Sequence, residues 1–233
     1  MIPLRDNAAP RRLTPVNIAL IAANIAVFVR ELTLGPRLAI FVHRFAMVPA
    51  LITPALSEGV PRGVGALAPL MTPVTSMFIH GGVLHIAGNM LYLFIFGAAV
   101  EYRLGSARYL IFYFAAGIAA ALATVWIAPE STVPVIGASG AIAGVLGAYF
   151  IFYPRGRILT ILPIFIFIQF IEIPAVVYLL FWFAVQLYAG LEQSGREAAM
   201  GGVAWWAHVG GFMFGVAMGP MLAINRPTRR RSR

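Results

Sequence analysis

Six long stretches of this chain contain no aspartate, glutamate, lysine or arginine. A helix that crosses a bilayer needs about 20 consecutive, mostly apolar residues. Hydrophobic residues make up 61% of the chain and charged residues only 11%, whereas a soluble domain carries about 25% charged residues. The sequence therefore predicts an all-α integral membrane protein with six spans. The predicted spans are Leu13–Val29, Gly81–Val100, Tyr109–Pro129, Ser131–Pro154, Ile173–Leu191 and Ala198–Asn225.

The spans form one predicted membrane domain, residues 15–225, between a short N-terminal segment, 1–14, and a tail, 226–233. The first span is long for a secretory signal and lacks a small-residue cleavage site, so we interpret it as an anchor. One further apolar stretch, Ile158–Ile171, is too short to cross the membrane and is interrupted at Pro163. We expect it to lie at the inner interface or to pack beneath the bundle.

All 17 basic residues are arginine, and the formal net charge is +9. They lie in loops and in the tail rather than on one folded face, so no nucleic acid is expected as a partner. Cytoplasmic loops of membrane proteins are enriched in arginine. With six spans, most of the arginines fall on one side, which predicts that both termini are cytoplasmic. These are Arg5, Arg11, Arg12, Arg103, Arg108, Arg155, Arg157, Arg226, Arg229, Arg230, Arg231 and Arg233.

Exclusive use of arginine is typical of G+C-rich bacterial genomes, so we expect the membrane to be the bacterial cytoplasmic (inner) membrane. The arginine-rich tail is expected to bind anionic membrane lipid.

Four polar side chains are predicted to lie at a common depth. A helix rise of about 1.5 Å per residue, counted from the charged inner ends of the spans, puts Ser139, His85, Asn89 and His208 roughly 21–27 Å above those ends. The hydrocarbon core is about 30 Å thick, so all four fall in its outer layer. Ionisable side chains in a membrane are costly and mark functional sites. We therefore interpret the four residues as one buried polar site.

Regularly spaced small residues are expected to bring two of the spans together. Small residues at every fourth position let helix backbones approach closely in lipid. Close packing of the fourth and sixth spans would put Ser139 and His208 within hydrogen-bond reach. The small residues are Gly140, Gly144 and Gly147 in the fourth span and Gly211, Gly215 and Gly219 in the sixth.

The residue types at this site fit acyl transfer. A serine hydroxyl attacks a carbonyl only when a neighbouring base takes its proton, and His208 is the base available to Ser139. None of the acids is expected beside His208, which predicts a Ser–His dyad rather than a triad. His85 and Asn89 share one helix face. With the backbone amide of Ser139, which is predicted to lie at a helix start, they form the predicted oxyanion hole.

Three other interpretations fit these residues less well. A lone serine in a membrane helix often bonds to its own backbone. His80, His85 and His208 are candidate zinc ligands, but the acid that accompanies zinc-protease histidines is missing, so we expect no metal and no other cofactor. A transporter would show internal repeats, which the sequence lacks. His80 lies off the face of His85, and we expect it to act at the helix start or in handling water.

These motifs resemble those of the rhomboid family of intramembrane serine proteases, over about Phe41 to Leu222. The family's two histidines and asparagine on the second core helix are matched by His80, His85 and Asn89. The Gly-x-Ser-Gly and Ala-His-x-x-Gly-x-x-x-Gly motifs are matched by Gly137, Ala138, Ser139, Gly140, Ala207, His208, Gly211 and Gly215.

The resemblance implies a six-helix rhomboid bundle of the bacterial type with an embedded first loop. It implies that Ser139 is the nucleophile, that His208 is the general base, and that His85, Asn89 and the Ser139 amide bind the oxyanion. Substrates would be single-span transmembrane proteins, cut near the outer end of the helix, usually after a small residue. They would enter beside the fifth span. An inactive rhomboid-like chaperone or scaffold is the alternative, but such relatives usually lack the serine or the histidine.

Two positions depart from the family pattern. Many members carry an aromatic residue one turn after the serine, which stacks on the histidine, whereas this chain has Ala143. We expect Trp205 or Phe212 to contribute to holding His208 instead. The family's Trp-Arg pair in the first loop is replaced by His43-Arg44-Phe45, which leaves the fine structure of this loop open.

The chemistry predicts that substrates contain helix-weakening residues. A helix in lipid hides its carbonyl groups in hydrogen bonds, so it must unwind before a serine attacks. Replacing glycine or proline near the cut site of a cleaved substrate with leucine should slow cleavage. Cleavage rates in lipid vesicles measure this, and equal rates for the parent and leucine-substituted substrates would contradict it.

Overall fold

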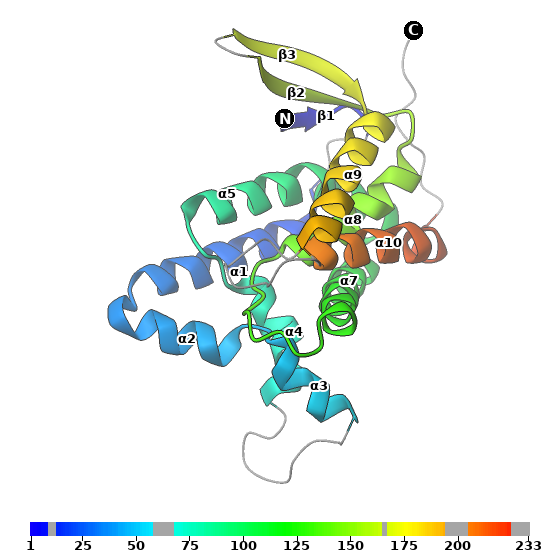
Figure 1. The fold of residues 1–233 in the computed structure, drawn as a ribbon. Coiled ribbons are helices and arrows are strands. Elements are labelled where there is room, and N and C mark those ends of the chain that lie inside the picture. The colour runs from blue at the N-terminus through cyan, green and yellow to red at the C-terminus, as the bar shows by residue number, and fades with distance from the viewer. Residues whose placement is uncertain (9–12, 58–67, 165–166, 194–204, 225–233) are drawn as a thin grey trace, which may run out of the picture.

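A computed structural model describes residues 1–8, 13–57, 68–164, 167–193 and 205–224. Within these ranges the chain is mostly helical, with a small sheet at one edge and α3 (Pro49–Ser57) at the opposite edge (Figure 1). The predicted arginine-rich tail and the first residues of the predicted sixth span lie outside the described residues.

Four helical segments among the described residues are long and apolar enough to cross a membrane. They are Pro15–Leu32 (α1), Val83–Leu104, Ser106–Ile127 (α7) and Ala175–Glu192, which lies within α9 (Ala175–Gln193). The other two predicted spans contain α8 (Ser139–Phe152), an apolar helix of only 14 residues, and α10 (Trp205–Leu222), which contains Pro220. An integral membrane protein is therefore supported, whereas the count of six spans stays a prediction.

The prediction of an all-α fold is wrong in one region. Residues Ile2–Asp6 (β1), Arg157–Ile164 (β2) and Phe167–Pro174 (β3) form an antiparallel sheet in the order β1-β2-β3. The apolar stretch Ile158–Ile171 is thus a hairpin. Its β-branched and aromatic residues favour strands, and the N-terminal strand that completes the sheet is too distant in sequence to be recognised as its partner.

Proline in β2 is tolerated because of the register. β1 pairs with β2 only as far as the Ile2–Ile161 pair, and Pro163 pairs with Ile168 of β3 alone. The missing N–H of Pro163 therefore faces an edge that β1 does not reach.

The ends of several helices meet the N-terminal segment on one side of the bundle. Glu101 accepts hydrogen bonds from the backbone amides of Val16 (3.2 Å) and Asn17 (2.7 Å) at the start of α1. The amide of Ile224 donates to the carbonyl of Arg103 (3.0 Å), next to the end of α6 (Ala98–Leu104). These contacts support the prediction that the arginine-bearing ends share one side. Which side faces the cytoplasm stays a prediction.

The second core segment contains a π-helical turn, η3 (Leu93–Gly97), between α5 (Val83–Tyr92) and α6. Such a turn disturbs the helical hydrogen-bond ladder. Asn17 Nδ2 donates to the Leu93 carbonyl (3.0 Å), and Tyr109 Oη donates to Asn17 Oδ1 (2.8 Å). A side chain at Gly97 would collide with Asn17, so glycine leaves the room this linkage needs.

Close packing of α8 and α10, predicted from the glycine spacing, is confirmed. A Cβ atom on Gly211 would collide with the carbonyl oxygen of Gly140, and one on Gly215 would collide with that of Gly144. A Cβ on Gly147 would collide with the carbonyl oxygen of Phe212. The two backbones therefore touch along several turns, which small residues alone permit.

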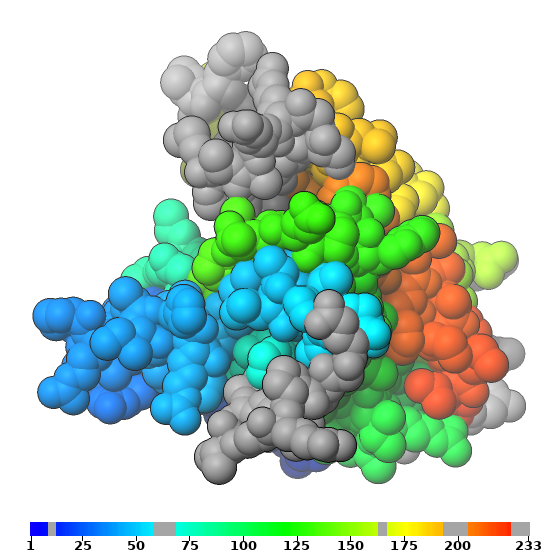
Figure 2. Space-filling view, turned by 60° about the horizontal axis from the view of Figure 1, so that its bottom comes forward, coloured from blue at the N-terminus to red at the C-terminus, as the bar shows by residue number. Residues whose placement is uncertain are grey.

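The segment before α8 is held by the region between α1 and α5. That region comprises η1 (Gly35–Arg37), α2 (Leu38–Phe45), α3, α4 (Ala68–Thr75) and η2 (Ser76–Phe78). Met47 and Val135 exchange backbone hydrogen bonds of 3.1 and 2.7 Å, and Ala50 N donates to Ser131 O (3.0 Å). Figure 2 shows the green segment before α8 lying along the cyan helices α3 and α4. Embedding of this first loop in lipid stays a prediction.

Alanine at Gly215 tests the contact between α8 and α10. The added Cβ would meet the Gly144 carbonyl oxygen, which is backbone and does not rotate away. We therefore expect Gly215→Ala to destabilise the protein by about 1–3 kcal/mol, the usual cost of overpacking. Thermal unfolding in detergent micelles measures the change.

Gly88→Ala is the matched control, because a Cβ there meets nothing within 4 Å. Helix propensity favours alanine over glycine by about 1 kcal/mol, so this variant should be as stable as the parent or more stable. Equal unfolding midpoints for the two variants would contradict the predicted contact.

Candidate active site

Ser139 is the first residue of α8, as the sequence predicts for a nucleophile at a helix start. The amides of the first helical turn have no partner within the helix and carry a partial positive charge. The preceding loop is fixed by a hydrogen bond from Gly137 N to the Ser76 carbonyl (2.9 Å). This geometry presents the Ser139 amide as a donor to an anion.

His85 and Asn89 of α5 lie against the backbone that leads into Ser139. A Cβ atom built on Gly137 would lie 2.7 Å from His85 Nε2 and 3.5 Å from Asn89 Nδ2. The amide of Gly81 donates to His85 Nδ1 (3.3 Å), so the proton of the neutral ring resides on Nε2. Both predicted donors of the oxyanion hole therefore face the Gly137 backbone.

His208 lies on α10 and is held mainly by α9. Its Nδ1 is 2.7 Å from Gln186 Oε1. The Trp182 ring lies 5.9 Å from the imidazole ring, tilted by 38°, and the Trp205 ring meets it edge-on at 6.2 Å. Contact with Trp205 was expected. Phe212 instead stacks on Phe183 at 4.7 Å, so the expected direct role for Phe212 is not seen.

Gln186 and Trp182 were missed by sequence reasoning. They lie four residues apart and so share a face of α9. A glutamine in an otherwise apolar span was the available signal, because polar side chains in such spans are expensive. The sequence spacing could not show that its partner on α10 is His208.

Ser139 and His208 come from neighbouring helices but share no hydrogen bond in this structure. A Cβ on Gly140, next to Ser139, would lie 3.7 Å from Cβ of Ala207, next to His208. His208 Nε2 is buried and has no hydrogen-bond partner among the described residues, and the same holds for Asn89 Nδ2. Buried polar atoms are normally paired, so each unpaired one calls for an explanation. A reacting carbonyl and a serine hydroxyl would supply the missing partners.

His80 packs against His85 just before α5 begins. Their ring centroids are 5.1 Å apart, with an interplanar angle of 66°. The amide of His80 donates to both carboxylate oxygens of Glu31, each at 3.3 Å. Glu31 is a buried acid near the end of α1. It thus orders the backbone that leads into α5, the helix that carries the predicted oxyanion donors. The sequence did not indicate this contact.

The alternative of a histidine zinc site finds no support in the geometry. Within the described ranges, no three histidine, cysteine or acidic side chains converge in a way that could hold a metal ion.

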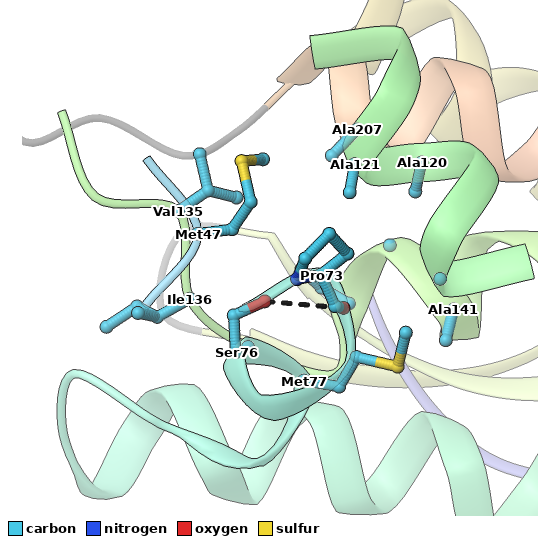
Figure 3. Close-up of a pocket in the computed structure, with 14 residues that line it drawn as sticks. Met47, Pro73, Ser76, Met77, Ala120, Ala121, Val135, Ile136, Ala141 and Ala207 are labelled. Carbon is cyan, nitrogen blue, oxygen red and sulfur yellow. Dashed lines mark hydrogen bonds between the residues drawn. The ribbon is translucent and has the colours of Figure 1, made fainter. Parts of the chain in front are cut away.

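A small cavity lies beside Ser139 and is lined mostly by apolar residues, large as well as small (Figure 3). Ala120 and Ala121 of α7, Ala141 of α8 and Ala207 of α10 lie in its wall. Ser76 Oγ donates to the Pro73 carbonyl (3.5 Å) at its edge. The cavity therefore offers a small apolar recess next to the candidate nucleophile.

Alanine at Gly137 should disable the oxyanion donors. Its Cβ would press on His85 Nε2, and φ of +113° strains any side chain there. We expect Gly137→Ala to slow the reaction of Ser139 with a fluorophosphonate by about 10²-fold, the usual effect of losing an oxyanion donor. Gel-based labelling rates measure this.

Gly35→Ala controls for backbone strain, because Gly35 has φ of +51° but nothing within 4 Å of the added Cβ. If Gly137→Ala and Gly35→Ala are labelled at the same rate, the close contact between residue 137 and His85 is not needed for the reaction of Ser139.

Comparison with known proteins agrees with this geometry. The Rhomboid domain model matches residues 68–225. "Rhomboid protein 1, mitochondrial" of Saccharomyces cerevisiae is 30% identical over 164 residues, which are 68% of this chain and 44% of that protein. "Rhomboid protease GluP" of Bacillus subtilis is 46% identical over 79 residues, 34% of this chain and 14% of that protein.

"Putative rhomboid protease YdcA" of Bacillus subtilis is 40% identical over 76 residues, 33% of this chain and 38% of that protein. The matched part of this chain thus spans less than half the length of each of these relatives. Since the family model covers well over half of the chain and includes every predicted site residue from His80 to Gly215, the chain belongs to the rhomboid family.

Proposed function

We propose that this protein is an intramembrane serine endopeptidase that hydrolyses peptide bonds of single-span membrane proteins near the outer membrane face. The observation that carries the proposal is the pair of unpartnered buried atoms, His208 Nε2 and Asn89 Nδ2, beside the helix start that bears Ser139. A Ser–His dyad needs a base nitrogen that is free to accept the serine proton, and an oxyanion hole needs a donor that is free to bind the oxyanion.

The reaction follows from these positions. His208 Nε2 takes the proton of Ser139 Oγ while Oγ attacks the scissile carbonyl carbon. The oxyanion accepts hydrogen bonds from His85 Nε2, Asn89 Nδ2 and the Ser139 amide. His208 then protonates the leaving amine. Water, activated by the same imidazole, hydrolyses the acyl-enzyme and restores Ser139, so no metal or cofactor takes part.

The surroundings of the site support a membrane substrate. The site is built from segments that include apolar, membrane-spanning candidates, and two relatives carry the word protease in their names. The alanine-lined recess beside Ser139 favours a small residue before the cut. We propose entry beside α9, both termini in the cytoplasm, and residence in a bacterial inner membrane, with the first loop embedded and six spans in all.

A catalytically inactive rhomboid-like scaffold is the rival function. It would have no need of a base with a free Nε2 or of an unpaired amide donor. Both are present here with Ser139, so the geometry favours the enzyme.

Removing either member of the dyad should abolish cleavage. We expect Ser139→Ala and His208→Ala each to lower kcat for a single-span model substrate by about 10⁴-fold or more, because dyad and triad members act as a unit. The purified variants are assayed in lipid vesicles, with and without a chelator.

Ser57→Ala, which changes an exposed serine of α3, is the matched control and should cleave normally. Cleavage by Ser139→Ala would exclude the proposed nucleophile, and chelator sensitivity would indicate a metal enzyme. A wild type that cleaves none of several substrates would favour the scaffold.

A further inference from the structure

Gln186 occupies the side of His208 that faces away from the proposed proton transfer. Its Oε1 lies 2.7 Å from His208 Nδ1, and both side chains are buried. We propose that Gln186 is a positioning residue that fixes the tautomer and orientation of His208, and so keeps Nε2 as the proton acceptor for Ser139. The inference rests on the proposed function and adds α9 to the helices α5, α8 and α10, which carry the proposed catalytic groups.

The orientation of the Gln186 amide is set by a second hydrogen bond. Its Nε2 donates to the backbone carbonyl of Trp182 at 3.2 Å. A carbonyl oxygen only accepts, so the amino group must face Trp182 and Oε1 must face His208. The flipped amide would place two acceptors against each other. The O/N assignment, which is often ambiguous for an amide, is therefore determined here by its neighbours.

This orientation determines which nitrogen of His208 carries the proton. An amide oxygen cannot donate, so His208 Nδ1 must be the donor. In a neutral imidazole the other nitrogen then holds the lone pair. That nitrogen is Nε2, which is buried and has no partner among the described residues. The tautomer selected by Gln186 is the one that general-base catalysis by His208 requires.

Two constraints on His208 come from one helix. Trp182 and Gln186 lie one turn apart on α9, and each contacts the imidazole ring. Ala143 provides no ring for the histidine to stack on. α9 therefore supplies both the aromatic ring that packs against His208 and the hydrogen bond, and the base is correctly held only while α9 packs against α10.

An amide suits this position better than a carboxylate for a physical reason. An ionised acid in apolar surroundings carries a large desolvation cost. A neutral amide orients the ring without that cost, as asparagine does in Cys-His-Asn proteases. Gln186 thus orients His208 although no acid among the described residues hydrogen-bonds to this histidine.

The first test compares cleavage by Gln186→Leu, Gln186→Glu and wild type in lipid vesicles. Leucine keeps much of the bulk but has no acceptor, whereas glutamate keeps one. We expect Gln186→Leu to lower kcat by at least about 10-fold and to leave KM unchanged. A positioned general base contributes roughly 10²–10⁴-fold to the reaction rate, and losing its orientation should remove part of that contribution. Gln186→Glu keeps an acceptor for His208 Nδ1 but buries a charge, so its kcat should fall less than that of Gln186→Leu. Gln169→Leu, the same change at an exposed site on β3, should match wild type.

The second test reads the tautomer directly, by ¹⁵N NMR of histidine-labelled protein. The chain has 4 histidines, and the His208 signals are identified by their loss in His208→Ala. Wild type and Gln186→Glu should show Nδ1 protonated and Nε2 free. Gln186→Leu should show a mixture or the reverse.

The two readouts separate the possible failures. Wild-type kcat in Gln186→Leu, or a lowered kcat with an unchanged His208 spectrum, would overturn the positioning role. If Gln186→Leu does not fold, Gln186→Asn, which withdraws the amide by one methylene, takes its place with the same expected results. If wild type itself cleaves nothing, the proposed function fails, while the NMR comparison still decides whether Gln186 sets the tautomer.

Discussion

The contact between the backbones of α8 and α10 is the feature on which the candidate site depends. Helices in lipid gain little from burying apolar surface against one another, so close van der Waals packing must hold them. Gly140, Gly144, Gly211 and Gly215 remove the side chains that would keep these helices apart. Ser139 and His208 lie next to this contact, one on each helix. A wider separation would move His208, the proposed base, away from Ser139.

Polar residues in the bundle fall into two groups. Glu101, Asn17 and Glu31 are buried, and each satisfies backbone groups that would otherwise be unpaired, at a helix start, a π-turn and the approach to α5. His208, Asn89 and His80 instead each keep a buried nitrogen that has no hydrogen-bond partner among the described residues. Burying an unsatisfied polar group costs about 1–3 kcal/mol. In the proposed function, a bound substrate would remove that cost at His208 and Asn89.

Much of the site followed from residue type and spacing. The helix start at Ser139 and the packing of the two glycine-rich helices were predicted and are seen, and His85 and Asn89 do approach the Ser139 loop. The sheet was not predicted, because β1 and β2 pair across most of the chain. The hydrogen bond between Gln186 and His208 was also missed, because it depends on the relative positions of α9 and α10 along their axes.

The sequence by itself determined that lipid surrounds this protein, and it determined which side-chain chemistry is available at the site. Long uncharged runs require lipid, and glycine spacing selects which helices touch, because both are local properties of the chain. The tertiary structure alone decided which nitrogen of His208 is free, which helix holds that ring, and where the N-terminal strand pairs. Those outcomes depend on contacts between residues far apart in sequence, whose relative positions are set only when the whole bundle packs.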